Sequence, residues 1–147
     1  SEYRDTAFAE PPATFDAEDS SLPYFKTQYD RVGVIYDGMI RMYEAAGFPV
    51  DPSFTRSIVL AIIGAQVWLD DVDDFAADRR NGQLTPVTAE YLLAEDDRAA
   101  YRRVVELTER YIDRAKTEAT AAESPLTGIA VEYIYREGTP EILPGAH

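Results

Sequence analysis

Apolar residues recur every three or four positions over residues 24–46, which is the spacing of one face of an α-helix. Gly47 follows directly, and glycine adopts the left-handed conformation with which many helices end. The recurring side chains are Phe25, Tyr29, Val32, Tyr36, Ile40 and Tyr43. We interpret them as the core-facing side of a first helix rather than as a cage for a ligand.

Prolines behind capping residues divide the remaining chain into helical segments. Proline is tolerated in a first helical turn because its missing N–H would have no partner there. The four pairs are Ser21 with Pro23, Asp51 with Pro52, Thr85 with Pro86, and Ser124 with Pro125. They predict helices over residues 51–81, from 86 to about 93, over 97–121 and over 126–135. The last segment also alternates like a strand, and we favour a helix.

These elements predict an all-α fold, a bundle of about four or five helices. A chain of 147 residues fits one domain with a substantial core. We expect an extended acidic arm over residues 1–22, one helical domain over 23–139 and a C-terminal tail over 140–147. An arm of this composition is mobile unless it packs on something.

The longest apolar run covers residues 57–69, about 13 residues, and a membrane span needs about 20. We therefore expect no membrane span. The N-terminus is acidic and lacks the basic-then-apolar order of a signal peptide, which favours a cytoplasmic protein. The first half of the predicted helix 51–81 is apolar all round, as in a helix buried inside a bundle.

The net charge of the chain narrows the classes of partner that it is expected to bind. Acidic residues outnumber basic ones 27 to 14, giving a net charge of −13, and such a surface repels nucleic acid and anionic lipid. Only Lys26 and Lys116 are lysines, and the other basic residues are arginines. This composition resembles that of proteins from extreme halophiles, where molar salt screens self-repulsion. The other interpretation is a simply acidic mesophilic protein.

The residues available for chemistry are few. The chain has no cysteine and its single histidine is His147, which excludes thiolate catalysis, iron–sulfur clusters, Ser-His-Asp triads and most zinc sites. Carboxylates, arginines and tyrosines remain. Acidic and basic residues between 103 and 114 alternate as exposed i,i+4 pairs. Arg56 is either a surface charge or an interior partner for aspartates, and we favour the surface.

The segment around residue 70 carries the strongest chemical signal. On a wheel of 100° per residue, the aspartates at positions 70, 71, 74 and 78 share one quadrant of the helix. Oxygen ligands without histidine or sulfur suit Mg²⁺, with arginine as a direct contact to an anion. The candidate metal ligands are Asp70, Asp71, Asp74 and Asp78, and the candidate diphosphate contacts are Arg79 and Arg80. The alternative is a structural acidic helix end whose charges pair with Arg79, Arg80 and salt ions.

The run Asp70-Asp71-Val72-Asp73-Asp74, followed by Arg79-Arg80 and Gly82, resembles the first aspartate-rich motif (DDxxD) of class I isoprenoid diphosphate synthases, the trans-prenyltransferase and terpene synthase superfamily. The resemblance implies an all-α fold in which Asp70, Asp71 and Asp74 ligate Mg²⁺ on an allylic diphosphate, with the two arginines on a substrate diphosphate. Asn81 is an additional residue before the glycine.

The family's second aspartate-rich motif is missing, and its catalytic domain is longer than this chain. Prenyl transfer would therefore require a site completed elsewhere. Two hypotheses follow. The first is Mg²⁺-dependent binding of a prenyl diphosphate by the aspartate-rich helix. The second is a non-catalytic halophilic helical domain that acts through protein contacts or self-association, which its tyrosine-rich helices favour.

Overall fold

The computed structural model describes residues 2–6, 8, 14–122, 126–135 and 140–147. These residues form helices and connections with no strand, so the predicted all-α fold is confirmed. Among them, five helices have eight or more residues: α4 (Val34–Ala45), α5 (Pro52–Gln66), α7 (Pro86–Leu93), α8 (Asp97–Ala121) and α9 (Leu126–Tyr135). The segment that could have been helix or strand is thus a helix.

Shorter elements complete the chain. The single-turn helices are α1 (Glu2–Asp5), α2 (Ala17–Ser20) and α3 (Phe25–Gln28), and α6 (Phe75–Arg80) is slightly longer. Two π-helical turns, η1 (Tyr29–Gly33) and η2 (Val67–Asp71), extend α4 at its start and α5 at its end. A 3-10 turn, η3 (Pro140–Ile142), lies near the C-terminus.

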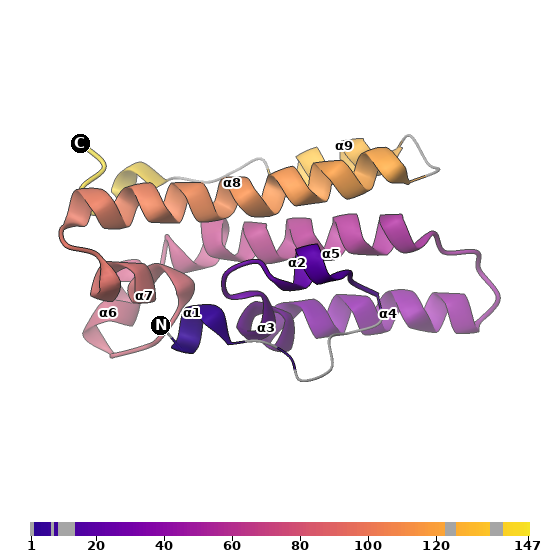
Figure 1. Ribbon diagram of the computed structural model, residues 1–147, viewed down its shortest axis with the longest axis horizontal. Helices are drawn as coiled ribbons and strands as arrows, with labels where there is room; N and C mark the ends of the chain where they lie inside the picture. Colours follow the sequence, from indigo (N-terminus) through magenta and orange to yellow (C-terminus); the bar gives the residue numbers. More distant parts are fainter. Residues whose placement is uncertain (1, 7, 9–13, 123–125, 136–139) are drawn as a thin grey trace.

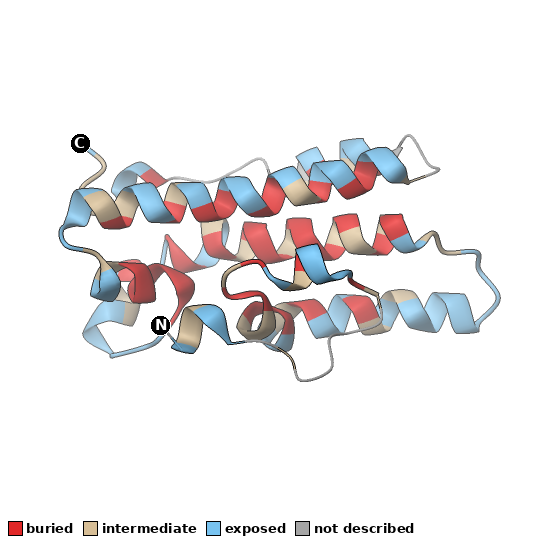
Figure 2. Cartoon of the chain, viewed as in Figure 1, coloured by how far each residue is buried: buried red, intermediate tan, exposed pale blue. Residues whose placement is uncertain are grey.

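Helix α5 forms the centre of the molecule (Figure 1). It packs on α8 and α9 on one side and on η1 and α4 on the other. Val59, Leu60 and Ile63 are completely buried, and Figure 2 shows α5 as the most continuously buried long helix. The predicted all-round apolar helix is therefore the core helix of the bundle.

With η2 included, the segment Pro52–Asp71 is long and apolar enough to cross a membrane by length and composition. In this structure 56% of its apolar window is buried inside the protein, and a core helix meets the same criterion. The burial by α8 and α9 accounts for its composition. The absence of a membrane span stays a prediction.

Two of the four predicted proline caps are present. Asp51 accepts a hydrogen bond from the Ser53 N–H (2.9 Å), and Thr85 forms a reciprocal capping box with Thr88. Ser21 does not cap the first long helix, because it ends α2 and the left-handed Tyr24 (φ 63°) precedes α3. The pair Ser124 and Pro125 lies outside the described residues.

The N-terminal arm is not simply extended. It contains α1 and α2, and Phe15 and Leu22 are buried in the core. The Phe15 ring meets Phe25 edge-on at 5.1 Å, and the Tyr24 N–H donates to the Arg4 carbonyl at 2.8 Å. The arm therefore contributes apolar surface that the long helices need for burial.

The apolar stripe of the first helix faces the core only in its first half. Phe25 and Tyr29 are buried, but Tyr36 is 40% exposed and Tyr43 58% exposed. In the π-helical turn η1, the Val34 N–H donates to the Tyr29 carbonyl five residues back, one residue further than in an α-helix. The side chains that follow are therefore rotated relative to their positions in a regular α-helix. The prediction of a core face is wrong for α4, although Gly47 (φ 97°) ends the helix as expected.

Candidate functional site

The helix predicted over residues 51–81 is interrupted within its acidic segment. In η2 the Val72 N–H donates to the Val67 carbonyl at 3.0 Å, a five-residue step. A turn over residues 72–74 follows before α6 begins at Phe75. Because the regular 100° step fails at η2, the four aspartates do not share one quadrant.

Asp71 turns inward at this interruption. Its side chain is 1% exposed, and Arg31 of η1 binds both carboxylate oxygens at 3.0 and 3.2 Å. Burial raises the pKa of Asp71 to about 6, against the lowering effect of Arg31, and the neighbouring Asp78 and Asp70 raise it further. A metal ion could reach this carboxylate only after Arg31 moved away.

Asp70, Asp74 and Asp78 are connected by backbone hydrogen bonds four residues apart. The Asp74 N–H donates to the Asp70 carbonyl and the Asp78 N–H to the Asp74 carbonyl, each at 2.8 Å. Asp70 and Asp74 are exposed and Asp78 is half-buried. Within the described part of the chain, these three carboxylates make no hydrogen bond or ion pair, so they are available to a ligand.

Asp70, Asp74 and Asp78 do not form a closed metal-binding cage. Among the described residues, no three acidic side chains of the 70–78 segment bring their oxygens within 4.8 Å of one another. Mg²⁺ usually keeps several waters and takes one or two carboxylates together with phosphate oxygens. Asp70 and Asp74, four residues apart, could supply these one or two carboxylates. A bound anion would have to supply the phosphate oxygens.

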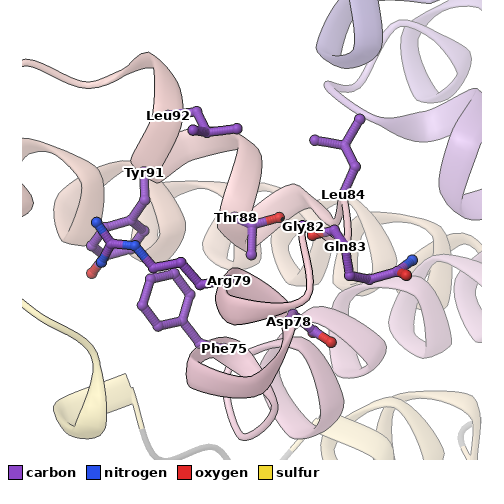
Figure 3. Close-up of a pocket in the computed structure, with 9 residues that line it drawn as sticks. All are labelled: Phe75, Asp78, Arg79, Gly82, Gln83, Leu84, Thr88, Tyr91 and Leu92. Carbon is purple, nitrogen blue, oxygen red and sulfur yellow. Dashed lines mark hydrogen bonds between the residues drawn. The ribbon is translucent and has the colours of Figure 1, made fainter.

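A pocket of about 120 Å³ lies beside this row, between α6 and α7 (Figure 3). The Arg79 guanidinium lies 5.5 Å from the centre of the Phe75 ring, and the Phe75 and Tyr91 rings are 4.6 Å apart. The pocket is lined by Phe75, Asp78, Arg79, Gly82, Gln83, Leu84, Thr88, Tyr91 and Leu92. It therefore combines apolar walls with one carboxylate and one guanidinium.

The loop that closes the pocket has a defined backbone. Gly82 (φ 67°) ends α6, with its N–H on the Arg79 carbonyl and the Gln83 N–H on the Asp78 carbonyl at 2.8 Å. This is the double hydrogen bond of a Schellman motif, which requires a left-handed residue. Arg80, the second predicted diphosphate contact, is exposed and does not line the pocket.

A second acidic group, which the sequence did not indicate, lies where the N-terminal arm meets α8. Asp16, Asp19 and Glu118 bring carboxylate oxygens within 4.8 Å of one another. Asp16 caps α2 through the Asp19 N–H, a local signal that the sequence does contain. The approach of α2 to Glu118 spans about a hundred residues, and no local pattern predicts it.

Two arginines already neutralise this second group. Arg114 donates to Asp19 at 2.8 Å, and Arg56 donates to Glu118 at 2.8 Å. The surface position favoured for Arg56 is therefore wrong, and Arg114 does not belong to an exposed i,i+4 row. Burial raises the pKa of Asp19 to about 6, opposed by Arg114 and aided by Glu118. We call this group of ion pairs the clasp, and we interpret it as holding the N-terminal arm on α8 rather than as a metal site.

The fold and the site together define an all-α protein whose central helix ends in an acidic row beside a small, arginine-bearing pocket. Comparison with protein-family models, with curated proteins and with solved structures finds no match.

Proposed function

We propose that the protein binds a small organic diphosphate, such as a short prenyl diphosphate, together with Mg²⁺ at the row of Asp70, Asp74 and Asp78. The observation that carries this proposal is the pocket between α6 and α7, where Asp78 and Arg79 lie beside apolar walls. A ligand with an anionic end and a short apolar end matches both features. The aspartate-rich motif resembles that of the isoprenoid diphosphate synthases, and that resemblance implies a ligand of this class.

Each residue has a distinct part in the proposed binding. Asp70 and Asp74 would hold the Mg²⁺, which supplies positive charge to a diphosphate when bound. Arg79 would donate directly to a phosphate oxygen, since guanidinium groups match phosphate geometry. Asp71 would stay with Arg31 and act indirectly, by holding η2 in its π-helical shape.

The pocket also limits the size of the ligand. Its volume of about 120 Å³ is small beside the roughly 300–1,000 Å³ of typical ligand pockets. A five-carbon group is therefore a better match than a long isoprenoid chain. This favours the short end of the prenyl diphosphates as the substrate class.

Isothermal titration calorimetry tests the proposal with inorganic pyrophosphate and with dimethylallyl diphosphate, each with and without Mg²⁺. We expect binding only with Mg²⁺, and tighter binding of dimethylallyl diphosphate because its apolar end enters the pocket. Asp74→Asn should weaken binding at least tenfold by removing a Mg²⁺ ligand. Arg79→Gln should weaken it to a similar extent by removing the anion contact.

Matched control variants separate a site from general charge. Asp113→Asn and Arg102→Gln remove one exposed charge each from α8, away from the pocket, and should leave binding unchanged. Equal binding with and without Mg²⁺, or the same loss in the α8 variants as in the site variants, would refute the proposal.

A further inference from the structure

Helix α4 has its apolar side turned outward. Along this helix and the residues just after it, large apolar side chains are 40–72% exposed. Figure 2 shows most of α4 as exposed surface. The exposed set, called here the α4 face, comprises Val34, Ile35, Tyr36, Met39, Met42, Tyr43 and Phe48.

The charged residues of α4 lie on the side of the helix opposite Met39. Asp37 is 1% exposed and accepts hydrogen bonds from Tyr29 and Thr14, while Arg41 binds it at 3.0 Å. At 100° per residue, Asp37, Arg41 and Glu44 fall within about 60° of one another, which leaves about 300° of the helix without charge. The α4 face therefore carries no charged side chain, although the net charge of the chain is −13.

The α4 face is large for a surface that stays in water. Taking about 150–200 Å² for each whole side chain, the exposed fractions amount to roughly 580–770 Å² of surface on these apolar residues. The largest apolar patch of a typical monomer is about 300–600 Å², and a standard interface buries about 800 Å² on each partner. The face alone supplies most of what one side of a stable dimer requires.

We propose that the α4 face binds the α4 face of a second copy of this chain, forming a two-fold symmetric dimer. Two chains of charge −13 repel each other over most of their surface, and this uncharged face lets them approach without apposing like charges. A lipid surface fits less well, because membrane-binding helices carry Lys and Arg on the polar side. Here the one basic residue of α4, Arg41, is bound to Asp37.

A two-fold axis near Met39 lets the face meet itself. In an antiparallel pair of helices Ile35 of one copy would lie near Tyr43 of the other, and Met42 near Tyr36. Gly38 borders the face, and a Cβ added there would meet nothing within 4 Å, so the second helix has room to approach. The flexible methionines can adapt to the aromatic rings opposite.

This dimer does not depend on the proposed diphosphate binding. The pocket lies between α6 and α7, at the opposite end of the molecule from the C-terminal end of α4 (Figure 1). A loss of dimerisation and a loss of ligand binding can therefore be observed separately. The two proposals can fail independently.

Sedimentation velocity over a range of protein concentrations in molar KCl tests the dimer. The parent chain should sediment as a dimer of 16.5 kDa subunits. Met42→Glu, at a residue 72% exposed, should raise the dissociation constant more than tenfold by placing two charges at the interface. Ile129→Glu, at an equally apolar residue 66% exposed on α9, should leave the dimer intact.

A cross-link tests the symmetry. The chain has no cysteine, so Met39→Cys introduces a single thiol that can form a disulfide only between two copies. Under mild oxidation it should yield a covalent dimer quickly, because the two Cα atoms lie near the axis. Ile129→Cys should not.

The proposal is overturned if the parent chain remains monomeric at every concentration, or if Met42→Glu dimerises like the parent. It is also overturned if the parent is monomeric and binds zwitterionic lipid vesicles through Met42. Circular dichroism of each variant establishes that the fold is intact, which is expected because the substituted side chains are largely exposed.

Discussion

Arg31 and Asp71 join the two π-helical turns found among the described residues. Arg31 lies on η1 and Asp71 on η2, and the two side chains form an ion pair at 3.0 Å in which Arg31 also donates a hydrogen bond of 3.2 Å to Asp71. The ion pair therefore fixes the start of the first long helix against the end of the central one.

The two partners differ in exposure, and this predicts an asymmetric effect of mutation. Arg31→Gln leaves the carboxylate of Asp71, 1% exposed, without a counter-charge, and should reduce the free energy of unfolding by about 2–4 kcal/mol. Asp71→Asn leaves Arg31, 40% exposed, to water and removes a buried carboxylate whose pKa is raised to about 6, so it should not reduce the free energy of unfolding at pH 7. Urea unfolding of the two variants at pH 7 measures the difference.

The exposed pair of Lys26 and Asp30 provides the control. Its side chains are 33% and 52% exposed, and Lys26→Gln should change the free energy of unfolding by less than about 1 kcal/mol. Equal losses from Arg31→Gln and Asp71→Asn would show that the pair is not organised around a buried carboxylate.

The sequence predicts helices well where the signals are local. The caps at Asp51 and Thr85 and the glycines at positions 47 and 82 mark real helix ends, because each acts on its own backbone neighbours. The position of Asp71 could not be predicted in this way. A wheel assumes a constant 100° step, and the π-helical turn that breaks this step has no local signature in the residues around it.

The remaining predictions failed where the structure depends on packing between residues that lie far apart in the sequence. The exposed position predicted for Arg56 rested on its place near a helix start, whereas its partner Glu118 lies 62 residues away. In the same way, the tyrosines of α4 have the spacing of a core face, but the inward side of that helix is occupied by Asp37 and its partners. The periodicity of apolar residues indicates a helix, but it does not indicate which side of that helix the rest of the chain covers.

The clasp at Asp19 predicts a dependence of stability on pH. The pKa of Asp19 is raised from 3.8 to about 6 in the folded protein, so between these values the folded state binds the proton more strongly than the unfolded state. The contribution of Asp19 to the free energy of unfolding therefore falls as pH rises through this window.

The substitution Asp19→Asn removes the titrating carboxyl group, and with it the pH-dependent contribution of Asp19 to the free energy of unfolding. Relative to Asp19→Asn, the parent should lose about 1–3 kcal/mol of stability between pH 4 and 7, measured by urea unfolding at several pH values. Parallel profiles for the two proteins would exclude a raised pKa at Asp19.

Gly145 predicts how the C-terminal tail is held. It has a φ of 86°, and a Cβ added there would come within 2.3 Å of the Asp97 backbone at the start of α8. Gly145→Ala should release the tail, in which Leu143 is buried and the Pro144 carbonyl accepts a hydrogen bond from Tyr91. The expected cost is about 1–3 kcal/mol.

Limited proteolysis checks this release. Cleavage after the last helix should be faster in Gly145→Ala than in the parent. Gly128→Ala is the matched control, because an added Cβ meets nothing within 4 Å there and its φ is not left-handed. Equal cleavage rates in the parent and Gly145→Ala would mean that the tail is not held at this contact.

The net charge of −13 predicts that salt stabilises the fold. Raising KCl from about 0.1 M to about 1 M shortens the Debye length from about 10 Å to about 3 Å, which screens repulsion between exposed carboxylates. Pairs with a buried partner, such as Arg31 with the buried Asp71, are screened less, so their contribution persists. Urea unfolding should therefore show a free energy of unfolding higher by about 1 kcal/mol or more at the higher salt.

Salt also strengthens apolar burial, and a charge-reduced variant separates the two effects. Glu95→Gln, Glu109→Gln and Asp113→Asn together remove three exposed negative charges without touching the core. If repulsion between carboxylates is the cause, this variant gains less from salt than the parent, because it has less repulsion to screen. An identical gain in both proteins would assign the effect to apolar burial and remove the physical basis for a salt-adapted surface.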